Sequence, residues 1–262
     1  MIALITGASS GIGRDMAKIL SSKGYDLIIV ARNKEALNNL KSELNTNVEV
    51  ISMDLSNVDN CKELYNKVKN RNIDILINNA GFGLLGEFNE TSLEKELNMI
   101  DLNIKSVHIL SKLFLKDFIK RDSGYILNVA SSAAFQPGPL MATYYSSKSY
   151  VYNLTLSIYG ELKKRKSNVH ISCLCPGPVD TNFNNVANCE FKAKSLTSYY
   201  VANYALNKMF KNKLLIIPGF SIKLLYIFGR LIPIKSKLNF TYNIQHNKIN
   251  NWINNKKMIN LL

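Results

Sequence analysis

Cysteine and histidine are scarce in this chain of 262 residues, which has four cysteines and three histidines. The sequence contains no CxxC pair and no His-rich cluster, which argues against a disulfide framework and a metal site and favours a reducing compartment. We therefore expect no bound metal. Cys173 and Cys175 are two residues apart, so they share one face of a predicted strand and are interpreted as core residues.

Acidic residues are also few, with 19 Asp and Glu against 33 Lys and Arg and a formal net charge of +14. A basic excess of this size is typical of nucleic-acid binding, but that function also needs a basic stripe interleaved with aromatic residues, which we do not find. We interpret the charge as a Lys- and Asn-rich solvated surface and expect no nucleic-acid partner. Hydrophobic residues make up 47 % of the chain, which is ample for the core of a single domain.

Long apolar runs are missing apart from residues 214–234. Residues 1–6 lack the basic leader of a secretory signal and run into a glycine turn, so we expect a first strand and a cytoplasmic protein. Residues 214–234 have the length of a membrane span, but two prolines, Lys223 and Arg230 interrupt them. Lys223 and Arg230 share one face of a helix, opposite apolar residues. We predict a last strand and an amphipathic helix over a substrate cleft or subunit contact; the alternative is a helix resting on a membrane surface, and thus a membrane-associated protein.

Short apolar runs alternate with amphipathic stretches along most of the chain. The runs are rich in Ile, Val and Leu, as expected for strands buried on both faces. The predicted strands are Ile2–Ile5, Leu27–Val30, Val48–Met53, Ile73–Ile77, Ile126–Val129, Val169–Cys175 and Leu214–Ile217, and the predicted helices lie near 12–23, 34–44, 57–70, 92–120, 143–165 and 197–210. This alternation predicts an α/β, Rossmann-type, doubly wound parallel sheet of about seven strands in a single domain, with its ligand site at the carboxyl ends of the strands.

A glycine-rich loop, TGASSGIG, follows the first predicted strand at residues 6–13. Gly7 permits a tight turn, Gly11 lets the backbone approach a phosphate, and Gly13 lets the next helix pack closely on the sheet. The helix that follows would present free N–H groups to a pyrophosphate. Placed between a first strand and a first helix, the loop favours dinucleotide binding.

The second predicted strand ends in Ala31 and Arg32, where an NAD site usually offers a carboxylate to the ribose 2′-hydroxyl. A guanidinium matches a 2′-phosphate in charge and geometry, so Arg32 favours NADP over NAD. Arg14 is a candidate second cation. Asp54, at the end of the third strand, is expected near the adenine.

Tyr-x-x-x-Lys occurs four times, at Tyr65, Tyr144, Tyr159 and Tyr204. Only Tyr144 follows a strand that ends in serines, which would bring Ser131 back over the carboxyl edge of the sheet. Lys148 lies on the same helix face as Tyr144, and a nearby ammonium makes a phenol easier to ionise. This set suits proton exchange with a carbonyl oxygen. Strand alternation turns Ser131 and Ser132 to opposite sides, and we favour Ser131.

With NNAG at 78–81, Asn103 and Pro176-Gly177, these motifs occur in the order of the short-chain dehydrogenase/reductase family, which the chain resembles over residues 1–182. The resemblance implies that Tyr144 is the general acid or base, that Ser131 binds the substrate carbonyl, and that Lys148 binds the nicotinamide ribose. It implies that Asn103 holds a water in the proton relay. The full set expected at the cofactor is Gly7, Ser9, Ser10, Gly11, Ile12, Gly13, Arg32, Asp54, Leu55, Asn78, Ala80, Gly81, Tyr144, Lys148, Pro176, Gly177, Val179 and Thr181.

Residues 1–262 are thus expected to form one NAD(P)-binding domain with a variable substrate-binding segment at about 183–235 and a polar tail at 236–262. Relatives imply a homodimer or homotetramer through the helices at 92–120 and 143–165. The expected function is an NADP(H)-dependent oxidoreductase for a small carbonyl or alcohol substrate. An apolar substrate is favoured by the predicted pocket residues Phe135, Leu140, Met141, Phe183, Tyr199 and Tyr200. The alternatives are a non-catalytic NADP-binding regulator or scaffold and an epimerase or dehydratase of the same family, whose loop would read TGxxGxxG.

Overall fold

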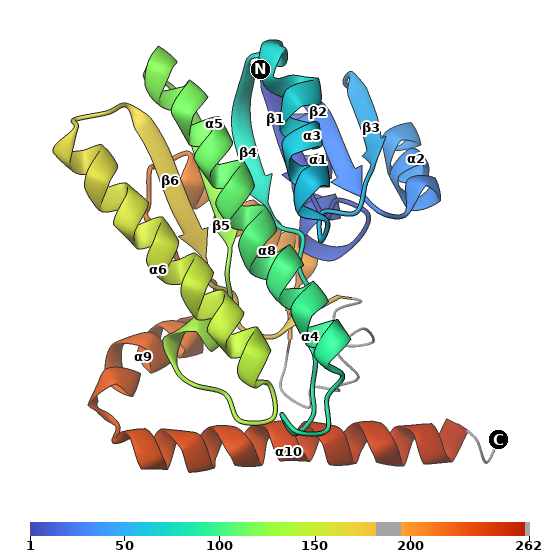
Figure 1. The fold of residues 1–262 in the computed structure, drawn as a ribbon, viewed down its shortest axis with the longest axis vertical. Helices are drawn as coiled ribbons and strands as arrows, with labels where there is room; N and C mark the ends of the chain where they lie inside the picture. Colours follow the sequence, from blue (N-terminus) through green and yellow to red (C-terminus); the bar gives the residue numbers. More distant parts are fainter. Residues whose placement is uncertain (182–194, 260–262) are drawn as a thin grey trace.

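Seven parallel strands form the central sheet of the protein, of which a computed structural model describes residues 1–181 and 195–259 (Figure 1). In spatial order the strands run β3-β2-β1-β4-β5-β6-β9. A separate pair of short parallel strands joins β7 (Val179–Asp180) to β8 (Leu196–Thr197). The strands of the main sheet are β1 (Ile2–Thr6), β2 (Asp26–Ala31), β3 (Val48–Ser52), β4 (Ile73–Asn78), β5 (Gly124–Val129), β6 (Val169–Leu174) and β9 (Leu215–Ile216). The predicted seven-stranded, doubly wound fold is confirmed.

Helices cover both faces of this sheet. The core on one face is shared with α1, α2 and α8, and the core on the other face with α3, α5 and α6. The helices are α1 (Gly11–Ser22), α2 (Lys34–Ser42), α3 (Val58–Val68), α4 (Leu93–Ile100), α5 (Val107–Arg121), α6 (Ala142–Lys164), α8 (Ser198–Met209), α9 (Phe220–Phe228) and α10 (Ile234–Ile259). α9 and α10 lie beyond the carboxyl ends of the strands, and α10 crosses that end of the molecule (Figure 1).

Strand alternation explains why the apolar runs are continuous. In β1, Ala3 and Ile5 enter the core on the α1 side, while Leu4 enters the core on the α3 side. Both faces of the strand are therefore covered by helices, as in all-parallel sheets. Cys173 and Cys175 are fully buried, and their Sγ atoms lie 3.6 Å apart, which confirms their interpretation as core residues.

The order of strands reverses between β1 and β4, because the chain runs outward from β1 to β3 and then returns to β4. Such a switch point opens a crevice at the carboxyl ends of the two strands, and ligands of doubly wound folds bind there. The glycine loop follows β1 and the NNAG motif begins at the end of β4, so the topology brings both motifs to the crevice.

The predicted helix at 92–120 is interrupted. A π-helical turn, Asp101–Ser106, separates α4 from α5 and contains Asn103. Extra residues of this kind in a helix are frequent at functional sites, because they redirect one side chain without ending the helix. Sequence periodicity predicted only one continuous helix here.

The C-terminal region follows one expectation and departs from another. Residues 214–234 contain the predicted last strand, β9, and the predicted helix, α9. In residues 1–181 and 195–259, no helix combines the length and apolarity needed to cross a bilayer. The segment 236–262 was expected as a polar tail, but most of it forms α10, in which Thr241 and Gln245 are buried.

Candidate active site

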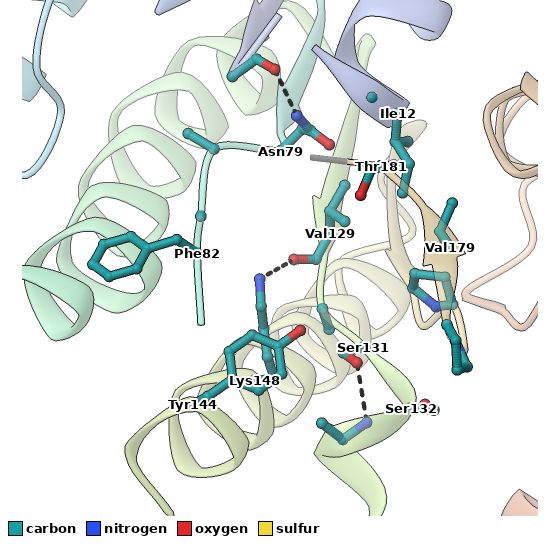
Figure 2. A pocket seen from close by; sticks show the side chains of 18 of the residues that line it. Ile12, Asn79, Phe82, Val129, Ser131, Ser132, Tyr144, Lys148, Val179 and Thr181 are labelled. Carbon is teal, nitrogen blue, oxygen red and sulfur yellow. Dashed lines mark hydrogen bonds between the residues drawn. The ribbon is translucent and has the colours of Figure 1, made fainter. Parts of the chain in front are cut away.

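The crevice between the strand ends and the C-terminal helices is a cavity of about 810 Å³. One wall is built from the loops that follow β1 to β6, and the opposite wall from α9 and α10. Figure 2 shows part of the first wall, with Tyr144, Lys148 and Ser131 grouped at one end of it. The volume lies within the range of pockets that enclose a small organic ligand or cofactor.

The glycine loop is part of the first wall. Gly7 has φ +66°, and a Cβ there would lie 2.8 Å from Cα of Ala80. A Cβ on Gly13 would lie 2.5 Å from both the carbonyl oxygen of Gly7 and Nδ2 of Asn79. The same Asn79 amide donates to the carbonyl oxygens of Thr6 (3.1 Å) and Gly7 (3.0 Å). Bare backbone at these positions lets the loop, α1 and the NNAG segment pack together.

The N-terminus of α1 is open toward the cavity. Side chains cap α2, α4 and α8 through Asn33, Ser92 and Thr197. In the described part of the chain, Ser10 makes no such hydrogen bond to α1. The residues around this end line the cavity. Unsatisfied N–H groups and the positive end of a helix dipole form a ready site for a phosphate.

Arg32 lines the far end of the cavity together with Asp54. Its side chain is exposed, whereas the Asp54 carboxylate accepts hydrogen bonds from the backbone N–H (3.0 Å) and hydroxyl (2.8 Å) of Ser56. Arg14, the candidate second cation, is instead paired with Glu43 at 2.8 Å and is not among the residues that line the cavity. Glu43, at the end of α2, lies within reach of the first turn of α1, so a role of Arg14 as a second cation stays a prediction.

Tyr144 and Lys148 lie one turn apart on α6 and both line the cavity. The Lys148 Nζ atom is 5.9 Å from the Tyr144 ring centre and donates to the carbonyl oxygen of Val129 at 3.0 Å. Burial lowers the pKa of Lys148 to about 8, although the nearby thiols of Cys173 and Cys175 act in the opposite direction. The ammonium is therefore held close to its own titration point beside the phenol.

The other three Tyr-x-x-x-Lys matches lie elsewhere, and none of their tyrosines is among the described residues that line this cavity. The Tyr65 hydroxyl donates to Asp117 at 2.6 Å, which is the main reason that the pKa of Tyr65 rises to about 12. Lys163 and Lys208 lie over the rings of Tyr159 and Tyr204. Tyr144 was favoured because it follows a strand that ends in serines, and of the four tyrosines it is the one that lines the described cavity.

Ser131 follows β5 directly and caps a short helical turn, Ser132–Phe135, by accepting a hydrogen bond from the backbone N–H of Ala133 at 3.1 Å. The capping contact fixes the side chain while leaving its hydroxyl proton available for a ligand. Ser132 also lines the cavity. Strand alternation predicted that Ser131 and Ser132 point to opposite sides, but both residues line the cavity.

Asn103 is fully buried and does not line the cavity formed by the described residues. Its Oδ1 accepts from the backbone N–H of Phe82 (3.1 Å), and its Nδ2 donates to the Phe82 carbonyl (2.9 Å) and to the Ser147 hydroxyl (3.1 Å). Ser147 in turn donates to the Tyr144 carbonyl at 2.7 Å. Asn103 thus ties the loop after β4 to the turn of α6 that carries Tyr144, which is a positioning role. A Cβ on Gly81 would lie 2.8 Å from Asn103 Oδ1 and 3.3 Å from Lys148 Nζ.

Two expected cofactor residues lie outside the cavity. Gly13 packs against Asn79, and Asn78 is buried under the crevice, where its amide donates to Ser111 (3.0 Å) and Asn128 (2.8 Å). Alternation along β4 directs Asn78 into the core, so that the next residue, Asn79, lines the cavity instead. The remaining expected residues line it: Gly7, Ser9, Ser10, Gly11, Ile12, Arg32, Asp54, Leu55, Ala80, Gly81, Tyr144, Lys148, Pro176, Gly177, Val179 and Thr181.

The apolar end of the cavity agrees in part with the expected pocket. Of the predicted residues only Met141 lines it, while Phe135 packs against Tyr152 and Tyr226, and Phe183 lies outside the described residues. Leu140 is buried elsewhere, and Tyr199 and Tyr200 are exposed on α8. The apolar lining comes from Ile222 and Leu225 of α9, which agrees with the predicted amphipathic helix over a substrate cleft, and from Phe82, Met141, Phe240 and Ile244.

Polar contacts that were not predicted from the sequence hold α10 over this end. The Gln245 amide donates to the Tyr145 hydroxyl at 2.6 Å. Within α10, Lys248 donates to the side-chain oxygen of Gln245 at 2.9 Å, which orients that amide. Gln136 donates to the Thr241 hydroxyl at 2.9 Å. Burial raises the pKa of Tyr145 to about 12. A Thr and a Gln four residues apart on a polar helix were the available signal, since they share one helix face.

Comparison with known proteins agrees with this arrangement. The family model described as short chain dehydrogenase matches residues 1–190. An uncharacterized oxidoreductase of Staphylococcus epidermidis is 36% identical over 183 residues, which cover 69% of this chain and 78% of that protein. One of Staphylococcus aureus is 31% identical with the same coverage. The chain belongs to the short chain dehydrogenase family. It is accordingly an oxidoreductase of that family.

Solved structures of dehydrogenases share the fold. A short-chain dehydrogenase from Sphingobium yanoikuyae in complex with NADPH has a TM-score of 0.80 and 27% identity, covering 88% of this chain and 93% of that one. A bulky-bulky ketone specific alcohol dehydrogenase from Comamonas testosteroni has a TM-score of 0.77 and 26% identity, covering 88% and 92%.

The residues present fit the dinucleotide that such dehydrogenases use. An uncapped helix N-terminus, backbone without side chains at Gly7 and Gly11, and a cavity of sufficient volume all lie on the first wall. A Cβ on Gly11, where φ is +53°, would lie 2.9 Å from Cγ2 of Thr181. In residues 1–181 and 195–259, no three His, Cys, Asp or Glu side chains gather into a group that would hold a metal ion.

Proposed function

We propose that this protein is an NADP(H)-dependent oxidoreductase that converts an apolar ketone or aldehyde to its alcohol, or the reverse. The observation that carries the proposal is that Tyr144, Lys148 and Ser131 lie together at one end of the cavity. The uncapped N-terminus of α1 lies against the same cavity. When bound, the nicotinamide supplies or accepts the hydride. The roles below belong to the protein's own side chains.

Tyr144 gives its hydroxyl proton to the carbonyl oxygen of the substrate during reduction and takes it back during oxidation. Lys148 stabilises the phenolate by its positive charge, and the carbonyl of Val129 keeps its ammonium in place. Ser131 donates a hydrogen bond to the substrate oxygen. Asn103 acts through position, because it fixes the segment of α6 around Ser147; a water held by Asn103 in a proton relay remains a prediction.

Arg32 supports NADP rather than NAD. It lines the cavity at the end of β2, and a guanidinium attracts a 2′-phosphate that a carboxylate would repel. The Sphingobium relative is described with NADPH, which is consistent with this preference. Binding of NADPH and of NADH, measured by nicotinamide fluorescence, tests the choice directly.

An apolar substrate is supported by the second wall, where Ile222, Leu225, Phe240 and Ile244 face the cavity. The Comamonas relative is described as specific for bulky-bulky ketones, and a similar class of substrate is the first to assay. A homodimer or homotetramer remains a prediction from the resemblance, and a cytoplasmic location remains a prediction from the sequence.

The decisive experiment compares Tyr144→Phe with Tyr159→Phe. Both tyrosines lie on α6 four residues before a lysine, but only Tyr144 faces the cavity that the described residues enclose. We expect Tyr144→Phe to lower turnover of an apolar ketone by about a hundred- to ten-thousandfold while NADPH binding stays unchanged, and Tyr159→Phe to behave as wild type. Full turnover by Tyr144→Phe would reject Tyr144 as the proton donor, whereas NADPH binding without any turnover in the wild type would favour a non-catalytic NADP-binding protein.

A further inference from the structure

Helix α9 presents an apolar face to the outside of the molecule. Phe220, Leu224, Ile227 and Phe228 are 75%, 38%, 58% and 57% exposed. They are spaced i, i+4, i+7 and i+8, so they form one stripe along the helix. The opposite side carries Ile222 and Leu225, which line the cavity. The helix was predicted to cover a substrate cleft or subunit contact with its apolar residues, or to rest on a membrane surface, and only its inner apolar residues are covered by the described parts of the chain.

The apolar face continues past the end of α9. Leu231, Ile232 and Ile234 are 80%, 44% and 55% exposed. Together with Phe220, Leu224, Ile227 and Phe228 they form a continuous segment that we call the α9 corner. Figure 1 shows α9 at the periphery, between α6 and the start of α10. Single exposed apolar residues are ordinary, whereas seven within 15 consecutive residues indicate an interaction surface.

Positive charge is concentrated in the same part of the chain. Residues 191–262 contain twelve lysines and arginines and no aspartate or glutamate, so they carry +12 of the formal net charge of +14. Lys223 and Lys235 are exposed within or beside the α9 corner, and Lys237 is half-buried in the first turn of α10. The family model matches residues 1–190, so this concentration of positive charge lies outside the region typical of the family.

We propose that the α9 corner docks on the surface of an anionic lipid bilayer. An apolar helix face flanked by lysines suits this environment, because the apolar side chains enter the acyl boundary while the lysines reach the headgroups. The nine residues of α9 make a helix of about 13 Å, which lies in the plane of the interface. Docking there places the apolar end of the cavity, lined by Ile222 and Leu225, next to the lipid.

The lysines of the α9 corner favour an anionic bilayer over a second copy of the chain as its partner. A two-fold contact through the α9 corner would bring each copy's Lys223 and Lys235 near the same residues of the other copy, and residues 191–262 supply no carboxylate side chain to pair with them. Like charges facing each other across an interface disfavour association. An anionic surface, in contrast, attracts every lysine at the corner.

The test measures cosedimentation of the full-length protein with phosphatidylcholine vesicles and with vesicles of equal parts phosphatidylcholine and phosphatidylglycerol. The α9 corner variant is Phe228→Ser/Leu231→Ser. Its matched control is Phe88→Ser/Leu93→Ser, since Phe88 and Leu93 are 69% and 70% exposed outside this corner. All four side chains are exposed, so both variants should fold, which circular dichroism checks.

We expect binding to the anionic vesicles, weaker binding to the neutral ones, and a loss of about tenfold or more in the corner variant only. High salt and Lys223→Gln/Lys235→Gln should each weaken binding to anionic vesicles. Absence of wild-type binding, or equal losses in the corner and control variants, would overturn the proposal. So would conversion of a wild-type oligomer to monomer by the corner variant in light scattering, because that result assigns the surface to a second copy.

Discussion

The two walls of the cavity are built from different kinds of parts. The wall formed by the ends of β1 to β6 consists largely of backbone, small side chains and a few polar groups fixed by hydrogen bonds, such as Lys148 on Val129 and Asn79 on Thr6. The wall formed by α9 and α10 consists largely of apolar side chains, among which Phe240 and Ile244 are 59% and 39% exposed. Hydrogen bonds fix polar groups within the first wall, and α10 of the second wall is joined to the rest of the protein by the contacts of Thr241 and Gln245.

This difference separates the two tasks of the proposed reaction. The first wall must place a cofactor and a proton donor to within a fraction of an ångström, which backbone glycines and buried hydrogen bonds achieve. The second wall must exclude water from an apolar ligand, and many different apolar side chains can do this. The matched family model stops at residue 190, before α9 and α10 begin. Substitutions in the first wall should therefore affect catalysis and cofactor binding, and substitutions in the second wall should affect substrate preference.

Lys148→Met should show the largest effect on the first wall. Without the ammonium we expect the kcat/KM for an apolar ketone to fall by about a hundredfold or more. Lys163→Met is the matched control, because Lys163 lies exposed over Tyr159 on the same helix. Equal losses in both variants would show that α6 tolerates no change in charge and would remove the evidence for a specific pair.

The same variant has a signature in stability. Burial lowers the pKa of Lys148 to about 8 from 10.5, so between these pH values the unfolded chain binds a proton that the folded protein has released. The free energy of unfolding should therefore rise with pH across this window, by about 3 kcal/mol in total from this group. Urea unfolding at pH 8 and at pH 10 should show about 2 kcal/mol of that contribution in wild type and its absence in Lys148→Met. An identical pH dependence in the two proteins would contradict the burial of the ammonium.

Arg32→Ser should change the cofactor preference. We expect the Kd for NADPH to rise about tenfold while that for NADH stays the same, because only the 2′-phosphate loses a charged partner. Arg14→Ser serves as the control, since Arg14 is paired with Glu43 away from the cavity. Fluorescence titration measures both constants, and equal weakening of NADPH and NADH would place Arg32 outside the 2′-phosphate site.

Ile244→Ala should have the smallest effect, confined to the second wall. We expect kcat/KM for a bulky ketone to fall about three- to tenfold, from lost apolar contact, with NADPH binding unchanged. Ile234→Ala removes the same side chain from the same helix at a position that does not line the described cavity. Weaker NADPH binding in Ile244→Ala would show that the two walls do not act separately.

The motifs after the strands were predictable because local rules fix them. A strand followed by TGASSGIG must turn tightly, and a tyrosine one helical turn before a lysine shares its face. The assignments of Asn78 and the pocket aromatics were harder, because they depend on which way a residue faces at the end of a strand and on where distant helices pack. Asn79 and Phe240 reach the cavity for those reasons.

Local patterns were enough to predict the alternating strands and helices, the nucleotide loop and the set of Ser131, Tyr144 and Lys148, because each depends on residues close together in the chain. The tertiary structure decided that α10 covers the cavity, that Asn103 ties Phe82 to Ser147, and that α9 turns an apolar face outward. Those arrangements join residues far apart in the chain, and local periodicity carries no information about which distant surface a helix will meet.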